Sequence, residues 1–250
     1  MGQRISHRGI YLLPNLFTTS SLFAAFYSIV ASLKSNFEMA VIAIFIGMIA
    51  DGLDGRIARL TNTQTAFGAE YDSLSDMVSF GVAPALLIYT WTLQFMGKLG
   101  WLIAFLFTAA VALRLARFNT QLDKADKRYF QGLACPSGAA LIASWVWICH
   151  QYNLDWQVIP WITLVLSLCC SLLMVSNIRY HSFKQIDLKG KVSFVTVLML
   201  VMVFVAIASS PATLLFLITF SYALSGPAKT LYMKHRMRKL RRRQSSGSSS

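Results

Sequence analysis

Hydrophobic residues recur along the sequence in long runs that short polar connections separate. A helix needs roughly 20 such residues to cross the hydrocarbon of a bilayer. The apolar run that starts at Phe37 ends too early at Ala50, so its helix must continue through Asp51 and Asp54. The pattern predicts an all-α polytopic membrane protein. We expect about eight transmembrane helices, over residues 12–33, 37–59, 69–95, 98–118, 133–151, 157–177, 192–209 and 211–232.

Composition supports this assignment, because 56% of the residues are hydrophobic and only 13% are charged. An ordinary soluble domain carries roughly 25% charged residues. Cys149, Cys169 and Cys170 lie within apolar runs, where a thiol acts as a small packing residue. Cys135 has no partner at metal-ligand spacing. A disulfide framework and a zinc site are therefore not expected.

The basic residues fall on one side of the predicted spans. Lys34 and Lys98 are the only two of the 23 that lie in connections of the opposite side. The positive-inside rule then places both termini and the acidic segment 51–76 in the cytoplasm. The net charge of +13 is concentrated at "KHRMRKLRRR", which suits an anionic lipid surface better than nucleic acid. We expect residues 1–233 to form the membrane domain, and residues 234–250 to form a basic, disordered tail.

Half of the ten acidic residues lie in "DGLDGRIARLTNTQTAFGAEYDSLSD", residues 51–76. Asp51 and Asp54 are spaced i, i+3, and Asp72 and Asp76 are spaced i, i+4, so each pair shares one face of a helix. Two antiparallel helices joined by a short loop can bring these faces together. Glu70 lies off the face of the second pair and is expected to be solvated. The spacing thus predicts four carboxylates around one small volume.

Four close carboxylates repel each other unless a cation is bound. Oxygen ligands without His or Cys favour a hard divalent ion such as Mg²⁺, Mn²⁺ or Ca²⁺. Mg²⁺ is often shared between carboxylates and a substrate phosphate. Gly52, Gly55 and Gly68 leave room for a headgroup near the backbone, and Arg56 and Arg59 offer donors to phosphate oxygens. These features indicate a site for a phosphorylated substrate at the membrane edge.

The acidic segment resembles the signature of the CDP-alcohol phosphotransferase family, D-x2-D-G-x2-A-R-x8-G-x3-D-x3-D. All eight fixed positions are present at the family's spacing. They are Asp51, Asp54, Gly55, Ala58, Arg59, Gly68, Asp72 and Asp76. The resemblance implies an all-helical membrane enzyme that transfers a phosphatidyl group from a CDP-linked lipid to an alcohol and releases CMP.

The resemblance also implies roles for individual residues. Asp51, Asp54, Asp72 and Asp76 would hold divalent metal, Mg²⁺ or Mn²⁺, as two ions. Asp76 would also accept the proton of the attacking hydroxyl. The CDP-lipid would contact residues in the signature and in the opening "LPNLFT" of the first span. These are Pro14, Asn15, Thr18, Gly55, Ala58, Arg59, Thr65 and Gly68.

Three further stretches resemble the phosphatidylserine synthase branch of that family: "RLARFN" at 114–119, "GLACPSGAA" at 132–140 and "LMVSNIRYHSFK" at 173–184. The second departs from the branch, because Ala134 and Cys135 separate Gly-Leu from Pro136. The resemblance implies CDP-diacylglycerol and L-serine as substrates, and a homodimer in a bacterial cytoplasmic (inner) membrane with its site facing the cytoplasm. Candidates for serine contacts are Arg117, Asn119, Arg179, Ser182 and Lys184.

Three other readings remain open at this point. A branch that uses phosphorylated or inositol acceptors would want extra basic residues, which Arg114, Lys124, Lys127 and Arg128 could supply. A transporter could use intramembrane carboxylates as a cation site, although it would place them near the bilayer centre. A non-catalytic scaffold would have no use for a base at Asp76. Serine candidates in basic connections also have a simpler explanation, which is the positive-inside rule.

Overall fold

Two long neighbouring helices form the N-terminal layer of the protein, α1 (Leu12–Leu33) and α2 (Phe37–Leu60). Ser35 takes a positive φ of 58° in the tight turn between them. The side chain of Asn36 caps α2 by accepting a hydrogen bond from the backbone N–H of Met39 at 3.4 Å. The computed structural model describes residues 12–61, 63, 65–121, 129–152, 157–181, 198, 201–202, 205 and 209–247.

The next helical segment is continuous but changes its winding in the middle. It consists of α3 (Ala66–Asp76), the π-helical turn η2 (Met77–Val82) and α4 (Ala83–Trp91). Turns of this kind are rare inside helices and are frequent at functional sites. Here the wide turn follows directly after Asp76. It therefore shifts the faces of α4 relative to the face that carries the aspartates.

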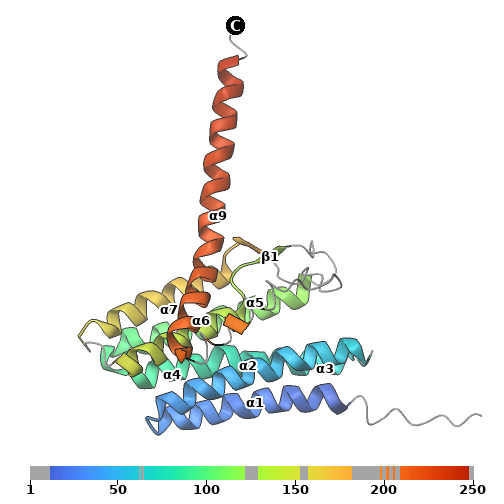
Figure 1. Cartoon of the computed structure of the whole chain (residues 1–250), viewed down its shortest axis with the longest axis vertical. Coiled ribbons are helices and arrows are strands. Elements are labelled where there is room, and N and C mark those ends of the chain that lie inside the picture. The colour runs from blue at the N-terminus through green and yellow to red at the C-terminus, as the bar shows by residue number, and fades with distance from the viewer. Residues whose placement is uncertain are drawn as a thin grey trace, which may run out of the picture.

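A second group of helices packs on the N-terminal layer of α1 and α2 (Figure 1). After the short turn η3 (Leu93–Met96) come α5 (Lys98–Gln121), α6 (Cys135–Tyr152) and α7 (Ile159–Val175). Helix α6 is central, because it contacts α2, α4, α7 and α9. Small residues such as Ala139 and Ala143 are fully buried on it, which permits close approach of its neighbours.

A short antiparallel ribbon joins two connections that are distant in sequence. Strand β1 (Tyr129–Gln131) pairs with β2 (Arg179–His181), and Phe130 lies opposite Tyr180. Gly132 has a φ of 78°, a conformation that favours glycine, and its N–H donates to the carbonyl of Ile178 at 2.8 Å. The periodicity of the sequence does not predict this ribbon.

Tyr180 attaches the ribbon to the last helix, α9 (Pro211–Gly247). Its ring is buried, and its hydroxyl donates to the carbonyl of Ala223 at 2.9 Å. Burial, with smaller contributions from Tyr222 and Cys170, raises the pKa of Tyr180 to about 12. Beyond this attachment α9 extends away from the helical body (Figure 1).

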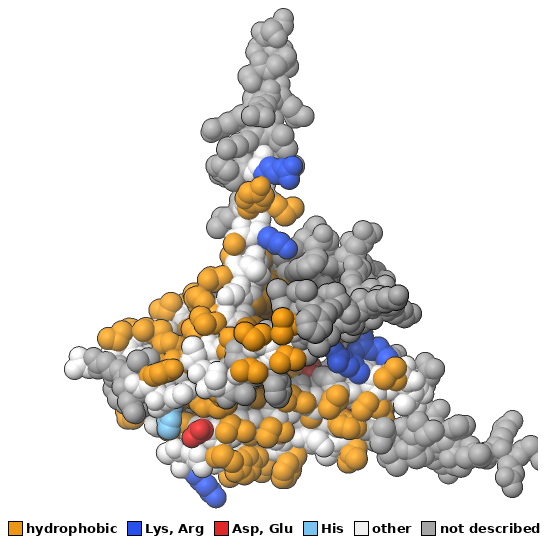
Figure 2. Space-filling model, viewed as in Figure 1, with side chains coloured by type: hydrophobic (Ala, Val, Ile, Leu, Met, Phe, Trp, Pro, Cys, Tyr) orange, Lys and Arg blue, Asp and Glu red, His pale blue; other side chains and the backbone are white. Residues whose placement is uncertain are grey.

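Large hydrophobic side chains are exposed over much of the helical body (Figure 2). Phe23, Ile49 and Phe105 are 71%, 65% and 63% exposed. Such a surface is unusual for a soluble monomer and is suited to lipid. Among the described residues, four helices are long and apolar enough to cross a membrane: Pro14–Leu33, Ala66–Trp91, Lys98–Thr120 and Pro211–Thr230.

The structure agrees in part with the predicted architecture. Helices lie where the first six spans and the eighth were expected, and a polytopic membrane protein is supported. Helix α7 has only 17 residues. Most of the predicted span 192–209 lies outside the described residues. The count of eight spans and the positions of the termini stay predictions.

Residues 234–247 of the predicted tail are described as part of α9, and the tail of residues 234–250 as a separate, disordered segment stays a prediction. Helix α9 continues through the basic segment, because Lys, Arg and Met are favourable helix formers.

Replacing Gly226 by Ala should detach α9 from the ribbon. An added Cβ would lie 2.3 Å from the Tyr180 ring, so the protein should lose about 1–3 kcal/mol of stability. Thermal unfolding in detergent would measure this loss. Gly52→Ala is the control, since its Cβ would meet nothing within 4 Å and should stabilise α2 slightly. Equal midpoints for the two variants would contradict the predicted role of this contact.

Candidate functional site

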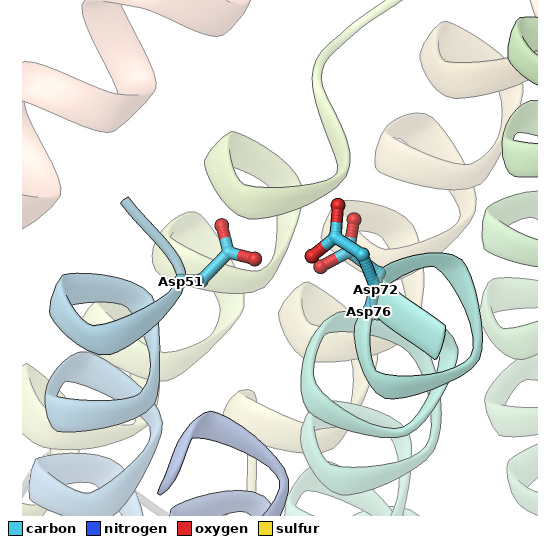
Figure 3. A group of neighbouring side chains, drawn as sticks. All are labelled: Asp51, Asp72 and Asp76. Atoms are coloured by element: carbon cyan, nitrogen blue, oxygen red, sulfur yellow. The ribbon is translucent and has the colours of Figure 1, made fainter. Parts of the chain in front are cut away.

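Three carboxylates meet where α2 faces α3 (Figure 3). Asp51 of α2 points toward Asp72 and Asp76 of α3, and one ligand oxygen of each lies within 4.8 Å of the others. All three side chains are half-buried. The structure therefore brings together three of the four aspartates that helical spacing predicted to converge.

Asp54 lies at the edge of this group instead of inside it. The side chain is only 5% exposed, and its Oδ2 atom accepts a hydrogen bond from Thr18 Oγ1 at 2.8 Å. Its charge still interacts with the charges of Asp51 and Asp72. The fourth predicted ligand is thus close to the group, but α1 holds its carboxylate in the described conformation.

The donor atoms of the group fit a hard divalent cation. The Oδ1 atoms of Asp72 and Asp76 are buried and have no hydrogen-bond partner among the described residues. Buried anionic oxygens without partners are costly, and their mutual repulsion adds to that cost. An oxygen-only set of this kind suits Mg²⁺, Mn²⁺ or Ca²⁺. The structure supports a metal-binding site without identifying the ion.

Hydrogen bonds of hydroxyl groups connect α1 to α2 and α3, the two helices that carry the aspartates. Ser75 donates to the carbonyl of Thr18 at 3.2 Å, and the hydroxyls of Thr19 and Tyr71 are 2.9 Å apart. One turn further along, Ser21 and Ser79 share a hydrogen bond of 3.3 Å. Sequence analysis missed these contacts, because serine and threonine are common in apolar helices and give no distinct signal there.

Two of the residues expected on the nucleotide side, Gly55 and Arg59, lie on an exposed face of α2. A Cβ added to Gly55 would meet nothing within 4 Å. Arg59 is exposed, and its Nε atom donates to the carbonyl of Gly55 at 2.8 Å. Its two terminal amino groups make no described hydrogen bond and can therefore donate to an anion. Ala58 is half-buried on the same helix.

Thr65 and Gly68, which were also expected to contact the CDP-lipid, lie at the start of α3. Thr65 caps the helix, and its Oγ1 accepts the backbone N–H of Gly68 at 3.0 Å. A Cβ at Gly68 would press on that hydroxyl at 3.1 Å and lie 3.5 Å from Asn15 Oδ1. Thr18 also reaches the carbonyl of Pro14 at 3.2 Å. These contacts place the beginning of α1 beside the beginning of α3.

The expected serine contacts are only partly described. Asn119 at the end of α5 donates to Ser73 Oγ at 3.1 Å, next to Asp72 in sequence. Arg117 donates to the Val175 carbonyl at 3.4 Å and also to the side chains of two residues, Gln131 and Asn177. Nothing is described of the Arg179 side chain, and the predicted contacts at Ser182 and Lys184 lie outside the described residues.

Comparison with known proteins agrees with the site. The family model of CDP-alcohol phosphatidyltransferase matches residues 11–173. The CDP-diacylglycerol–serine O-phosphatidyltransferase of Helicobacter pylori is 39% identical over 196 residues, which cover 78% of this chain and 83% of the relative.

Relatives of the same name occur in distant organisms. That of Mycobacterium leprae is 31% identical over 218 residues, 85% of this chain and 72% of the relative. That of Methanocaldococcus jannaschii is 37% identical over 155 residues, which cover 62% of this chain and 68% of the relative. The aspartate signature, the carboxylate group and the matched length lead to one conclusion: this chain belongs to the CDP-alcohol phosphatidyltransferase family.

Proposed function

We propose that the protein transfers the phosphatidyl group of CDP-diacylglycerol to the hydroxyl of L-serine, giving phosphatidylserine and CMP. The observation that carries this proposal is the group of three carboxylates within 4.8 Å on α2 and α3. The acceptor follows from the shared name of the relatives, CDP-diacylglycerol–serine O-phosphatidyltransferase.

The carboxylates would hold a divalent metal, and two Mg²⁺ or Mn²⁺ ions are proposed. Asp51, Asp72 and Asp76 would be ligands in the described arrangement, and Asp54 would join them from the edge of the group. When bound, such ions neutralise negative charge on the oxygens of the pyrophosphate. The orphaned oxygens of Asp72 and Asp76 support this role.

Asp76 is proposed as the base of the reaction. Its carboxylate takes the proton of the serine hydroxyl, which is otherwise a poor nucleophile at neutral pH. The serine oxygen forms a bond to the phosphorus that carries diacylglycerol, and the bond from that phosphorus to the oxygen of CMP breaks. Asp76 suits this task because it lies beside Asp51 and Asp72, where the reacting groups would be collected.

The CDP-lipid is proposed to bind over the open face of α2. Gly55 leaves space for the nucleotide, and the terminal amino groups of Arg59 provide donors to its phosphates. Asn15 and Thr18 of α1 border the same region, with Thr65 and Gly68 at the start of α3. Ala58 and Pro14 complete the proposed contacts by packing.

The distribution of charge supports the proposed orientation. The aspartates and the end of α5 lie together, as the bond between Asn119 and Ser73 requires, whereas Lys34 lies in the turn at the other end of α1 and α2. A site at the cytoplasmic edge of an inner membrane would let acyl chains stay in lipid while serine and CMP exchange with water. A homodimer is proposed from the family resemblance.

Replacing Asp76 by Asn should abolish CMP release from CDP-diacylglycerol and serine. Loss of a general base lowers rates by roughly 10²- to 10⁴-fold, and loss of a ligand adds to this. Purified protein with Mn²⁺ or Mg²⁺ would be assayed with serine, glycerol 3-phosphate and inositol separately. Glu70→Gln is the matched control, because Glu70 is an exposed carboxylate on the same helix.

Release by the wild type with another alcohol alone would overturn serine as the acceptor. Absence of metal-dependent release with any alcohol would overturn the transferase.

Addition of Mn²⁺ or Mg²⁺ to metal-free protein should raise its thermal unfolding midpoint. A ligand at 100 times its dissociation constant stabilises by about 2.7 kcal/mol, and a cation also relieves the repulsion within the group. Asp72→Asn should remove most of this shift, and Glu70→Gln should retain it. An identical shift in wild type and Asp72→Asn would mean that the ion binds elsewhere.

Replacing Gly55 by Leu should impair catalysis without impairing folding. The added side chain would enter a space that is open in the protein alone, so the thermal midpoint should stay the same or rise. The KM for CDP-diacylglycerol should increase at least tenfold, because the proposed nucleotide occupies that space. Steady-state kinetics and thermal unfolding would test both effects. An unchanged KM would remove Gly55 from the proposed contacts.

A further inference from the structure

The two arginines of "RLARFN" have different surroundings, although both lie near the end of α5. Arg117 donates to the Val175 carbonyl and to the side chains of Gln131 and Asn177. These acceptors belong to the last residue of α7, to the connection after it and to β1. The guanidinium of Arg117 therefore joins three segments of the protein and already has its acceptors.

Arg114 has far fewer partners. One of its terminal amino groups lies 3.3 Å from the Cys135 thiol, which is a weak acceptor. Its Nε atom is buried and has no hydrogen-bond partner among the described residues. No described carboxylate accepts a hydrogen bond from it. A partly buried guanidinium in this state is costly, and an anionic ligand would satisfy it through charge-assisted hydrogen bonds.

The position of Arg114 relates it to the carboxylate site. Cys135, at the first residue of α6, interacts electrostatically with both Arg114 and Asp76. Helix α6 also contacts η2, which begins directly after Asp76. The thiol thus lies within electrostatic range of the proposed base and of the unpaired cation. The guanidinium, which belongs to α5, also interacts electrostatically with Tyr222 of α9.

Serine has the chemistry that this arrangement requires. Its hydroxyl and its carboxylate are on adjacent carbons, so one molecule can direct the hydroxyl to a base and the carboxylate to a nearby cation. A guanidinium binds a carboxylate with two parallel hydrogen bonds, for which Nε and one terminal amino group are suited. The Nε atom of Arg114 is the donor that lacks an acceptor.

We propose that Arg114 binds the carboxylate of the acceptor, whereas Arg117 is a positioning residue that holds β1 and the end of α7 on α5. This inference rests on the proposed transfer to serine and gives the acceptor side of that reaction a specific residue. It also changes the expectation from sequence, in which Arg117 was a candidate for serine contact and Arg114 was weighed only within a basic cluster for phosphorylated acceptors.

The test compares Arg114→Gln, Arg114→Lys and Arg117→Gln in the purified full-length protein. CMP release gives the KM for L-serine and for CDP-diacylglycerol. L-alanine, which has the carboxylate and ammonium but no hydroxyl, gives an inhibition constant that reports acceptor binding without chemistry. L-serinamide, which lacks the carboxylate charge, is tested as the alternative acceptor. Thermal unfolding of each variant reports folding.

In Arg114→Gln, the KM for serine and the inhibition constant of alanine should rise together by about 10- to 100-fold. The KM for CDP-diacylglycerol should stay the same, and the preference for serine over serinamide should shrink. Arg114→Lys should restore part of the binding, and it decides the question if Arg114→Gln does not fold. Arg117→Gln should lower the thermal midpoint and kcat, with the alanine constant unchanged within about twofold.

An unchanged alanine constant in a folded Arg114 variant would overturn the role of Arg114. An increase in Arg117→Gln equal to that expected for Arg114→Gln would overturn the division between the two arginines. Absence of serine-dependent CMP release by the wild type is a different result, because it removes the proposed function before any variant is compared.

Discussion

Electrostatic repulsion among carboxylates is the constraint around which this protein is built. Asp51, Asp72 and Asp76 are held within 4.8 Å although like charges at such distances oppose folding. The free energy that offsets this repulsion comes from the packing of α2 and α3 on α1. Hydrogen bonds of hydroxyl groups, such as those of Thr18 and Ser75, add to it. These bonds tie both acidic elements to one neighbour, so the carboxylates cannot relax apart independently. A site that stores repulsion in this way is suited to a divalent cation and, through it, to phosphate groups.

Helical periodicity was sufficient to predict the part of the site that depends on local structure. The i, i+3 and i, i+4 spacings place each pair of aspartates on one face of its helix, whatever surrounds it. The boundaries of α1 and α2 follow from apolar length and a tight turn at Ser35. The π-helical turn after Asp76 could not be predicted, because it arises where η2 packs against α1 and α5 and not from any residue pattern.

The difference between Arg114 and Arg117 shows where sequence reasoning ends. At a separation of three residues they occupy similar positions on α5, and both satisfy the positive-inside rule. Their partners come from elements remote in sequence, the thiol of Cys135 for one and the ribbon and the end of α7 for the other. No periodicity encodes such contacts. The ribbon itself depends on pairing between β1 and β2 across some 50 residues, which a search for apolar runs does not detect.

The contacts of Tyr180 extend beyond the part of the chain that the family model matches. The family model ends at residue 173, before β2 and α9. Yet Tyr180 attaches β2 to Ala223 and Gly226 of α9, β2 pairs with β1, and Arg117 holds β1 on α5. The proposed acceptor side of the site is thus braced in part by β2 and α9, which lie outside the matched region, whereas the aspartates lie within it. The proposed chemistry therefore depends on α2 and α3, whereas the proposed division between Arg114 and Arg117 depends on contacts that the ribbon and α9 support.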